Sequence, residues 1–265
     1  MKLFYRKYGE GYPLIILHGL YGCSDNWVSI GKELAKTFQV FIPDIRNHGK
    51  SPHSNEHNYE VMTNDLIEFM NFHSIEKAVL LGHSMGGKII MNFSVRYPER
   101  IEKMIILDIA PKTYSFDDDI KSDEHRKVIN ALLNFDIAKF NNRKDIAIEF
   151  SKADINDNYK KFLLKNIYRD NGNHFLWKIN IKAINENLQQ IMNGLEQERN
   201  FSNSSNCLFI KAENSNYILE NDYALIKKIF TNSQITTIKN ASHWLHIEYP
   251  KLIIQKILDF TSNQI

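Results

Sequence analysis

The stretch LLGHSMGGK, residues 80–88, places a serine between glycines. Gly82, Ser84 and Gly86 fit the pattern G-x-S-x-G, with an apolar run before it and a helical pattern after it. In that setting the pattern predicts a sharp turn from strand to helix that lifts the hydroxyl of Ser84 above the edge of a sheet. The alternative is a glycine-rich turn that serves only close packing, with Lys88 as a solvated helix residue. A nucleophilic serine also requires a base, an acid and oxyanion donors elsewhere in the chain.

The composition is that of a folded, soluble protein. The chain has 265 residues, which suits one large domain or one domain with a sizeable insertion. Apolar residues make up 43% and charged residues 24% of the chain, close to the average for soluble proteins. The formal net charge is +2, and the lysines and arginines are scattered. Nothing therefore favours nucleic acid or a strongly charged partner.

No segment is predicted to enter a membrane or the secretory pathway. The apolar run at residues 14–17 is too short for the core of a signal peptide, and no run reaches the roughly 18 residues that stable membrane insertion needs. Cys23 and Cys207 lie far apart and match no metal-ligand spacing. We therefore expect free thiols in a reducing, cytoplasmic compartment, and neither a metal nor another cofactor.

Short apolar runs alternate with helical patterns along the chain. The runs are apolar at consecutive positions, which is typical of strands covered on both faces in a parallel sheet. They occupy residues 13–19, 38–45, 76–84, 102–111, 206–213 and 233–242. Helical patterns occupy residues 61–73, 87–101 and 249–260. This alternation predicts an α/β fold with a mostly parallel central sheet flanked by helices.

One region departs from this alternation. Residues 112–205 contain polar, helical patterns and no convincing buried strand, apart from a short stretch at 173–180 that fits a hairpin or the start of a helix. We interpret residues 112–205 as a helical cap inserted after the strand that ends at Asp108. Residues 1–111 and 206–265 would then form the core that carries the sheet.

The turn LHGLYG, residues 17–22, follows the first predicted strand and is expected to lie beside the serine. The backbone N–H of Met85, at the start of a helix, is one predicted oxyanion donor, and the N–H of Leu20 is the other. We expect the imidazole of His18 to be an ordinary buried side chain that shapes this turn through hydrogen bonds.

The predicted base comes from the stretch NASHWLHIEYP near the end of the chain. The sequence contains ten histidines, and His243 directly follows the sixth predicted strand, at the edge where sheet-based sites gather. His246 falls in the next turn and is the alternative, although we expect it to be a neighbour of the site rather than the base.

The acid is the harder assignment. In the chain order serine, acid, histidine, it lies between residues 84 and 243. The loop after the fifth predicted strand has Ser215 where a carboxylate is expected, with Glu213 nearby. Asp108 instead ends the fourth predicted strand, and an acid in that position is unusual unless its charge is used or paired. We favour Asp108 as the acid, with Glu213 and Asp222 as alternatives. If Asp108 is not the acid, its expected role is structural, as a cap on the end of its strand.

Four motifs, LHGLYG, PDIRNHGKS, GHSMGGK and SHWLHIEYP, resemble those of the α/β-hydrolase superfamily over the whole chain. The finer pattern RNHGKSP, LDIAP, FLWKIN and ENSNYI is similar to the bacterial YbfF-like esterase group, which is related to the ABHD-type esterases. In that group an Asn-Ser pair replaces the acid after the fifth strand, as Asn214 and Ser215 do here, and the acid matches Asp108. Ser242 and Ala212 stand where glycines are usual, which affects loop conformation but removes no catalytic group.

The resemblance implies a serine hydrolase that cleaves short carboxylic esters or acyl thioesters, with acyl-CoA among the candidate substrates. A carbon–carbon bond hydrolase or lyase on the same scaffold and a non-catalytic ligand-binding protein are the alternatives. The expected partner is therefore a small-molecule ester or acyl-CoA, and the chain is expected to be a monomer or small homo-oligomer. The predicted substrate-binding residues are Tyr21, Trp177, Asn180 and Trp244, with Phe116 and Phe175 as further aromatic candidates; each aromatic candidate of the cap also fits an ordinary core position.

Overall fold

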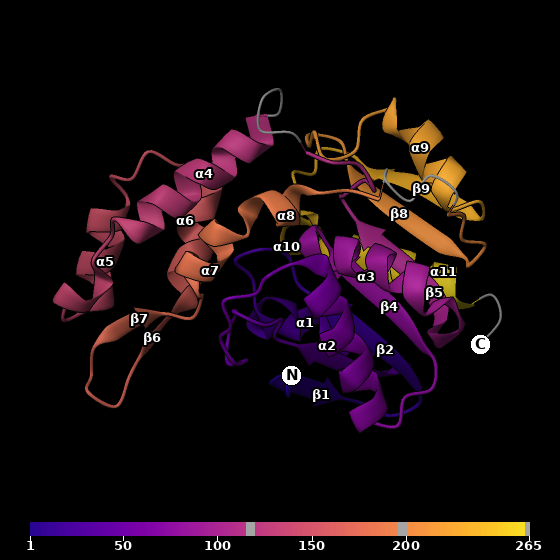
Figure 1. Cartoon of the computed structure of the whole chain (residues 1–265), viewed down its shortest axis with the longest axis horizontal. Helices are drawn as coiled ribbons and strands as arrows, with labels where there is room; N and C mark the ends of the chain where they lie inside the picture. Colours follow the sequence, from indigo (N-terminus) through magenta and orange to yellow (C-terminus); the bar gives the residue numbers. More distant parts are fainter. Residues whose placement is uncertain (115–119, 196–200, 263–265) are drawn as a thin grey trace.

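A seven-stranded sheet runs through the middle of the molecule (Figure 1). The structure is a computed structural model that describes residues 1–114, 120–195 and 201–262. The strands of the sheet are β1 (Tyr5–Tyr8), β2 (Tyr12–Leu17), β3 (Phe38–Pro43), β4 (Ala78–His83), β5 (Ile101–Leu107), β8 (Cys207–Ala212) and β9 (Ser233–Ile238). The helices outside residues 112–205 are α1 (Val28–Leu34), α2 (Tyr59–Phe72), α3 (Met85–Arg96), α9 (Asp222–Ile229), α10 (Leu245–Glu248) and α11 (Pro250–Ser262).

The strand order is β1-β3-β2-β4-β5-β8-β9, and only β1 is antiparallel to its neighbour. The six parallel strands are those predicted from the apolar runs. Strand β1 was not predicted, because it lies at the edge of the sheet, is half-exposed and so lacks a continuous apolar run. Helices α1 and α9 were not predicted either.

The register brings the carboxyl ends of four strands together at one edge of the sheet. Leu17 of β2 pairs with Gly82 of β4, His83 pairs with Leu107 of β5, and Leu107 pairs with Ile210 of β8. The residues that follow these strands therefore come side by side, although the sequence separates them widely. This edge is where the predicted elbow, acid and base meet.

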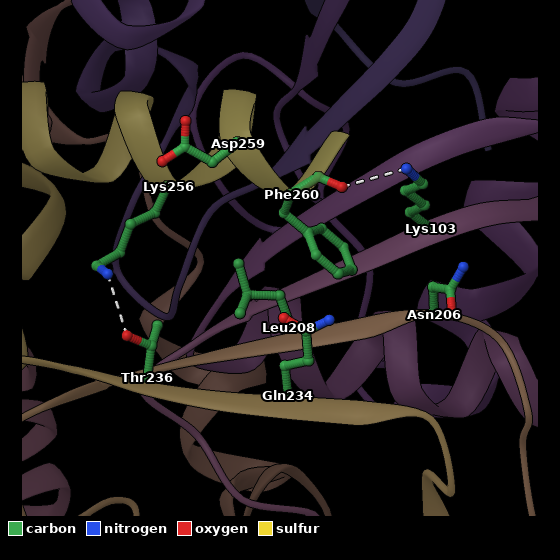
Figure 2. Close-up of a pocket in the computed structure, with 8 residues that line it drawn as sticks. All are labelled: Lys103, Asn206, Leu208, Gln234, Thr236, Lys256, Asp259 and Phe260. Atoms are coloured by element: carbon green, nitrogen blue, oxygen red, sulfur yellow. Dashed lines mark hydrogen bonds between the residues drawn. The ribbon is translucent and has the colours of Figure 1, made fainter. Parts of the chain in front are cut away.

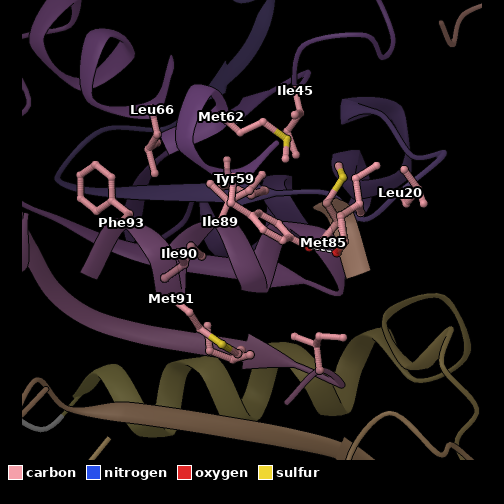
Figure 3. Packing of buried hydrophobic residues seen from close by; sticks show 14 of the residues in the cluster. Leu20, Ile45, Tyr59, Met62, Leu66, Met85, Ile89, Ile90, Met91 and Phe93 are labelled. Carbon is pink, nitrogen blue, oxygen red and sulfur yellow. Dashed lines mark hydrogen bonds between the residues drawn. The ribbon is translucent and has the colours of Figure 1, made fainter. Parts of the chain in front are cut away.

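Successive strand residues point to opposite faces, which gives the sheet two apolar layers. On one face, Ile15, Leu80 and Ile106 belong to a cluster that includes α2, α3 and α9. On the other face, Leu14, Leu81 and Ile105 pack with α1, α10 and α11. Figure 3 shows the first cluster near the elbow, with side chains of α2 packed over those of α3. The two layers hold the strands in place and so fix the edge on which the site lies.

Between β5 and β8 the chain forms helices and a separate two-stranded hairpin that extend to one side of the sheet (Figure 1). We call residues 112–205 the insertion. Its helices are α4 (Ile120–Leu133), α5 (Arg143–Phe150), α6 (Asp157–Leu163), α7 (Ile181–Glu186) and α8 (Leu188–Met192), and its strands are β6 (Ile167–Arg169) and β7 (Phe175–Trp177). The helices α7 and α8 are divided at Asn187, whose side-chain amide donates to the carbonyls of Ala183 and Asn55.

Lys88 ties the elbow helix to both ends of the insertion. Its side chain is only 1% exposed, and its ammonium donates to the carbonyl of Lys112 and, at 2.7 Å, to that of Asn193. It also lies over the ring of Tyr114, at 4.9 Å from the centroid. Lys88 is therefore a buried link between α3 and the insertion, not a solvated helix residue.

Cys23 and Cys207 are both buried free thiols. Among the helices that the structure describes, none combines the length and the apolar character needed to cross a membrane.

Candidate active site

Ser84 lies at a strained turn between β4 and α3. Its backbone has φ 53° and ψ −119°, a conformation that costs a non-glycine residue on the order of 1–3 kcal/mol. The strain is balanced by fixed contacts: the amide of Ser84 donates to the carbonyl of Leu107 at 3.0 Å, and its carbonyl accepts from the amide of Lys88 at 3.1 Å. The side chain is 8% exposed and reaches a cavity at the edge of the sheet.

The glycines around the elbow are required by close backbone approach. A Cβ at Gly86 would lie 2.3 Å from the carbonyl oxygen of Leu17, and one at Gly82 would lie 2.5 Å from the backbone of Gly86. No side chain can relieve either contact, because both involve backbone atoms. The elbow and the turn after β2 are therefore locked together, which is the arrangement that the G-x-S-x-G pattern predicts.

Asp108 and His243 form a buried pair. Nδ1 of His243 donates to Oδ2 of Asp108 at 2.8 Å, and the carboxylate of Asp108 is fully buried. The amide of Ala212 donates to its other oxygen at 2.9 Å, and the hydroxyl of Ser215 also donates to Oδ2. Three donors thus surround one carboxylate. Because a carboxylate only accepts, Nδ1 of His243 carries the proton, which leaves Nε2 as the nitrogen able to accept one.

The alternative acids lie elsewhere. Glu213 accepts a hydrogen bond from the amide of Asn240 at 2.7 Å, on the exposed side of the loop. Asp222 pairs with the ammonium of Lys112 at 2.9 Å and accepts from the amide of Leu219. Of the three candidates, only Asp108 forms a hydrogen bond or ion pair with His243 within the residues that the structure describes.

The ring of Tyr217 stacks on the imidazole of His243. The ring centroids are 3.9 Å apart and the planes are inclined by 24°. The hydroxyl of Tyr217 lies 3.1 Å from Nε2 of His125, a residue of α4, and Nδ1 of His125 lies 3.3 Å from the hydroxyl of Tyr21. His125 therefore connects the stacked tyrosine to the turn after β2.

That turn lies directly beside Ser84. A Cβ at Gly19 would be 3.2 Å from Cβ of Ser84. Nε2 of His18 accepts from the amide of Ile45 at 2.9 Å, so its Nδ1 donates to the carbonyl of Gly19, also at 2.9 Å. His18 thus holds the turn, as expected for a buried structural histidine. No described group accepts a hydrogen bond from the amides of Leu20 or Met85.

Other histidines near the site are poor bases. Burial lowers the pKa of His246 to about 3, with His243 adding to the effect, and burial lowers the pKa of His83 well below its ordinary value. The ring of His246 stacks on Trp27 at 4.6 Å between centroids. Nε2 of His83 lies 2.9 Å from the carbonyl of His243. Both side chains are thus fixed, neutral neighbours of His243. The described His, Cys, Asp and Glu side chains form no group able to hold a metal ion.

The cavity beside Ser84 is lined by side chains from both the sheet edge and the insertion. From the sheet edge come His243, Trp244, Trp27 and Leu20, and from the insertion come His125, Tyr159 and Phe162. Trp244 packs against Phe162 at 4.3 Å between ring centroids. Of the predicted substrate-binding residues, Trp244 alone lines this cavity, while Tyr21 is fully buried and meets the ring of Tyr159 edge-on, at 6.2 Å between centroids.

The structure does not bring Trp177 and Asn180 to this cavity. Trp177 packs in the insertion against Phe150, at 5.5 Å between ring centroids. Asn180 begins α7, and its side-chain amide donates to Asn47 at 3.0 Å and to the carbonyl of Ser54 at 3.3 Å. Phe175 belongs to a small apolar cluster inside the insertion. Phe116 lies outside the described residues.

The pocket residues His125, Tyr159 and Phe162 were not predicted. His125 left a usable signal, because Val128, Ile129 and Leu132 follow it at intervals of three, four and seven on the buried face of α4. A histidine that shares the apolar face of an inserted helix is a candidate to face the site. Tyr159 and Phe162 left no comparable signal, since several other aromatic residues of the insertion occupy similar positions.

A separate cavity of about 440 Å³ lies between β8, β9 and α11 (Figure 2). It is at the opposite edge of the sheet, where β5 and β8 begin. Figure 2 shows its two lysines already engaged: Lys103 donates to the carbonyl of Phe260 at 3.1 Å, and Lys256 donates to Thr236 at 3.1 Å. Its lining residues include no serine, cysteine or histidine, so they offer no pair of activated nucleophile and base, and the Ser84 cavity is the candidate active site.

Comparison with known proteins agrees with this geometry. Residues 12–250 match the α/β hydrolase fold family. The chain belongs to this family. A solved structure of a marine microorganism esterase superposes on this hydrolase with a TM-score of 0.93 at 44% sequence identity, covering 98% of this chain and 99% of that one.

Relatives of this hydrolase include the group expected from the motifs. It is 34% identical over 258 residues to the Danio rerio protein named sn-1-specific diacylglycerol lipase ABHD11, covering 95% of this chain and 79% of the relative. It is 29% identical over 245 residues to Esterase YbfF of Escherichia coli, covering 92% and 91%. The resemblance to the YbfF-like and ABHD-type proteins is thereby confirmed.

Proposed function

We propose that this hydrolase cleaves carboxylic esters through an acyl-serine intermediate, with Ser84 as nucleophile, His243 as base and Asp108 as the acid that orients the base. The observation that carries the proposal is the buried pair of Asp108 and His243, 2.8 Å apart, at the cavity that Ser84 also lines. Membership of the family and the esterase names of its relatives support the same reaction class.

The reaction proceeds in two balanced halves. Oγ of Ser84 attacks the ester carbonyl carbon, and its proton passes to Nε2 of His243. The imidazolium, stabilised by Asp108, then protonates the leaving oxygen as the bond between the carbonyl carbon and that oxygen breaks. In the second half, water attacks the acyl carbon, gives its proton to His243, and releases the acid while Ser84 regains its proton.

The amides of Leu20 and Met85 stabilise the oxyanion in both halves. Two features support these roles: the turn that contains Leu20 lies against Ser84, and Met85 is the first residue of α3, where backbone N–H groups are free of helical partners. An oxyanion donor of this kind typically lowers the barrier by about 3–4 kcal/mol.

The shape of the cavity favours short acyl groups. Its volume is about 10 Å³, room for about one water molecule, because Trp244, Phe162 and Tyr159 close it. A short acyl chain fits after modest movement of these rings, whereas a long chain requires displacement of α6. Residues 112–205 therefore act as a cap that limits acyl length. Thioesters with short acyl groups are a second candidate substrate class, because the same attack on the carbonyl carbon cleaves them.

The nucleophile is tested with a fluorophosphonate probe, which labels activated serines. Wild-type protein should be labelled and the Ser84→Ala variant should not, with loss of ester hydrolysis by several orders of magnitude. Ser94→Ala is the matched control, because Ser94 is a fully buried serine on the same helix, whose hydroxyl donates to the carbonyl of Met91. Labelling of Ser84→Ala at the wild-type rate would contradict the mechanism.

The substrate class is tested with p-nitrophenyl esters of increasing acyl length, together with acyl-CoA and a dienone substrate for carbon–carbon bond hydrolysis. We expect kcat/KM to be highest for acetyl and butyryl esters and to fall with longer chains. Preference for the dienone would replace ester hydrolysis with carbon–carbon bond hydrolysis on the same triad.

A further inference from the structure

A second cavity, of about 130 Å³, adjoins the Ser84 cavity. Tyr159, His243 and Trp244 line both, so the two spaces meet at the proposed base. The remaining lining side chains of the outer cavity are neutral polar or acidic: Glu124, Asn156, Asn158, Asn214, Ser215, Tyr217 and Ser242. No described lysine or arginine lines it.

The position of His243 suggests what the outer cavity holds. In the proposed reaction His243 protonates the leaving oxygen, so that oxygen lies within hydrogen-bond reach of Nε2 when the ester bond breaks. The acyl group occupies the narrow, aromatic space beside Ser84. The rest of the alcohol must then extend away from Ser84 past His243, and the outer cavity is the space that shares His243 with the inner one.

The outer cavity has an acidic electrostatic character. Burial is the main cause that raises the pKa of Tyr217 and of Tyr21 well above the ordinary value, and the negative charge of Glu124 raises both further. Glu124 also adds to the raised pKa of Tyr159, which burial dominates. Its field therefore reaches three side chains around the two cavities, as expected for a carboxylate in partly desolvated surroundings.

We propose that the outer cavity is the leaving-group subsite, and that it selects uncharged or cationic alcohols with hydrogen-bonding groups over leaving groups that carry carboxylates or phosphates. The side-chain amides of Asn156, Asn158 and Asn214 supply donors and acceptors for a hydroxylated or ammonium-bearing alcohol, whereas the hydroxyl of Ser242 is engaged by Glu248. Coenzyme A, with its phosphates, is disfavoured as a leaving group. This inference rests on the proposed ester hydrolysis at Ser84.

The test compares acetyl esters that differ in the charge of the alcohol. Acetylcholine and 3,3-dimethylbutyl acetate have nearly the same shape, but only the first is cationic, and acetyl-CoA supplies a polyanionic leaving group. We expect kcat/KM for acetylcholine to exceed that for the neutral ester by about tenfold, as for a charge pair separated by several ångströms in partly solvated surroundings. We expect acetyl-CoA to be the poorest of the three substrates when each kcat/KM is compared with the rate of uncatalysed hydrolysis of that substrate.

Glu124→Gln should reduce the ratio of kcat/KM between acetylcholine and the neutral ester to about one. Glu149→Gln is the matched control: Glu149 is a solvent-exposed carboxylate of α5, paired with Lys152 and absent from the outer cavity. That variant should keep the wild-type ratio. If Glu124→Gln is poorly folded, the ratio is measured in the wild type at rising salt concentration. Salt screens the charge of Glu124, so the ratio should fall toward one.

The outcomes separate this inference from the proposed function. A ratio near one in the wild type, or an unchanged ratio in Glu124→Gln, overturns the leaving-group subsite while hydrolysis of p-nitrophenyl acetate by Ser84 stands. Preference for acetyl-CoA over the neutral ester overturns it as well. Absence of Ser84-dependent hydrolysis of any ester instead overturns the proposed function.

Discussion

The sheet edge and the insertion contribute to one pocket by different physical means. At the sheet edge, Ser84 and Asp108 lie at strand ends fixed by backbone hydrogen bonds, and the glycines of the elbow allow backbone contacts that no side chain can adjust. The insertion contributes His125, Tyr159 and Phe162, from helices α4 and α6, to the pocket.

The insertion is attached to the rest of the chain at several points, including a backbone hydrogen bond from the amide of Asn180 to the carbonyl of Asn47 at 2.9 Å. Asn166 donates to the carbonyl of Tyr21 at 2.6 Å, and the hydroxyl of Tyr59 donates to the carbonyl of Ile191 at 2.6 Å. Lys88 provides a further link at the two ends of the insertion. The reacting groups at the sheet edge are fixed by backbone hydrogen bonds, which suits bond making and breaking. The aromatic side chains that the insertion adds to the pocket are positioned by packing, which can change its fit to the substrate. Changes at the sheet edge should therefore lower kcat, and changes in the insertion should alter stability or substrate choice.

The largest expected effect is at the sheet edge, on Asp108. Asp108→Asn removes the charge that orients and stabilises His243, and we expect kcat to fall by about ten-thousand-fold. Asn is the suitable replacement, because Asp108 has φ 49°, a backbone conformation that Asn tolerates well. Steady-state kinetics on p-nitrophenyl acetate measure the effect, with unfolding in urea to show that the fold persists.

Asp222→Asn and Glu213→Gln are the controls for that prediction, because neither carboxylate contacts His243. Both variants should keep kcat within about twofold of wild type. If Asp108→Asn retains most of its activity and one of the controls does not, the acid is misassigned and the sheet edge does not fix the chemistry as we infer.

Much of the sheet edge could be predicted from the sequence, for physical reasons. A strand covered on both faces is a continuous apolar run, so β2 and β4 stand out, and an acid that interrupts such a run, as Asp108 does, must be paired or used. The elbow glycines are required by close backbone contacts, one within the elbow between Gly82 and Gly86 and one between Gly86 and Leu17 of β2. The role of Ser215 as a hydrogen-bond donor to Asp108 was not predicted, because the two residues follow neighbouring strands, β8 and β5, and lie 107 positions apart in the chain.

The sequence predicts that the insertion is helical, but it does not predict which of its side chains face the pocket. Its aromatic residues recur at helical spacing, and spacing alone does not show whether Phe162 or Trp177 faces the pocket. Tertiary packing decides this: α6 lies against Trp244, while Trp177 packs against Phe150 within the insertion. Asn180 was placed in the pocket on sequence grounds, yet its amide is used between α7 and the loop at Asn47.

The sheet edge should also be the more acid-sensitive region. His246 is buried against Trp27, and its pKa of about 3 lies below the roughly 6.5 of an imidazole in the unfolded chain. Between these values the unfolded chain binds a proton that the folded chain does not, so the free energy of unfolding falls as the pH falls from 6.5 toward 3. The loss from this one side chain at pH 4 is on the order of 3 kcal/mol.

His246→Phe keeps a ring that can stack on Trp27 but cannot take up a proton. We expect its free energy of unfolding, measured in urea at pH 7 and pH 4, to decline less between the two than that of the wild type. An equal decline in both proteins would show that other groups dominate acid unfolding, and that the buried histidines do not distinguish the sheet edge from the insertion.

A smaller effect is expected at Tyr217, where the two regions meet. Its ring stacks on His243 and its hydroxyl contacts His125 of α4. Tyr217→Leu removes the stacking, and we expect kcat to fall about five- to tenfold, in line with the energy of an aromatic pair. Tyr217→Phe keeps the ring and loses only the hydroxyl, so its kcat should fall less than twofold.

Measuring the pH dependence of kcat in both variants separates a positioning role from a purely structural one. A misplaced imidazole alters the pH profile in Tyr217→Leu, whereas a general loss of packing lowers the rate at every pH alike. If Tyr217→Phe loses as much activity as Tyr217→Leu, the hydroxyl and its contact with the insertion matter more than the stacked ring, and the insertion would then contribute to the chemistry itself.

The smallest effect on catalysis is expected at Asn180. Its side chain accepts from the amide of Ala183 at the start of α7 and donates to Asn47 across the boundary with the sheet region. Asn180→Ala removes both, so we expect a loss of about 1 kcal/mol of stability, which lowers the unfolding temperature by about 2–4 °C in a chain of this size. The kcat/KM for p-nitrophenyl acetate should stay within about twofold of wild type, since Asn180 does not line the Ser84 cavity. A tenfold loss of kcat/KM with an unchanged unfolding temperature would place Asn180 at the substrate, and the insertion would then bind substrate through more than the helices α4 and α6.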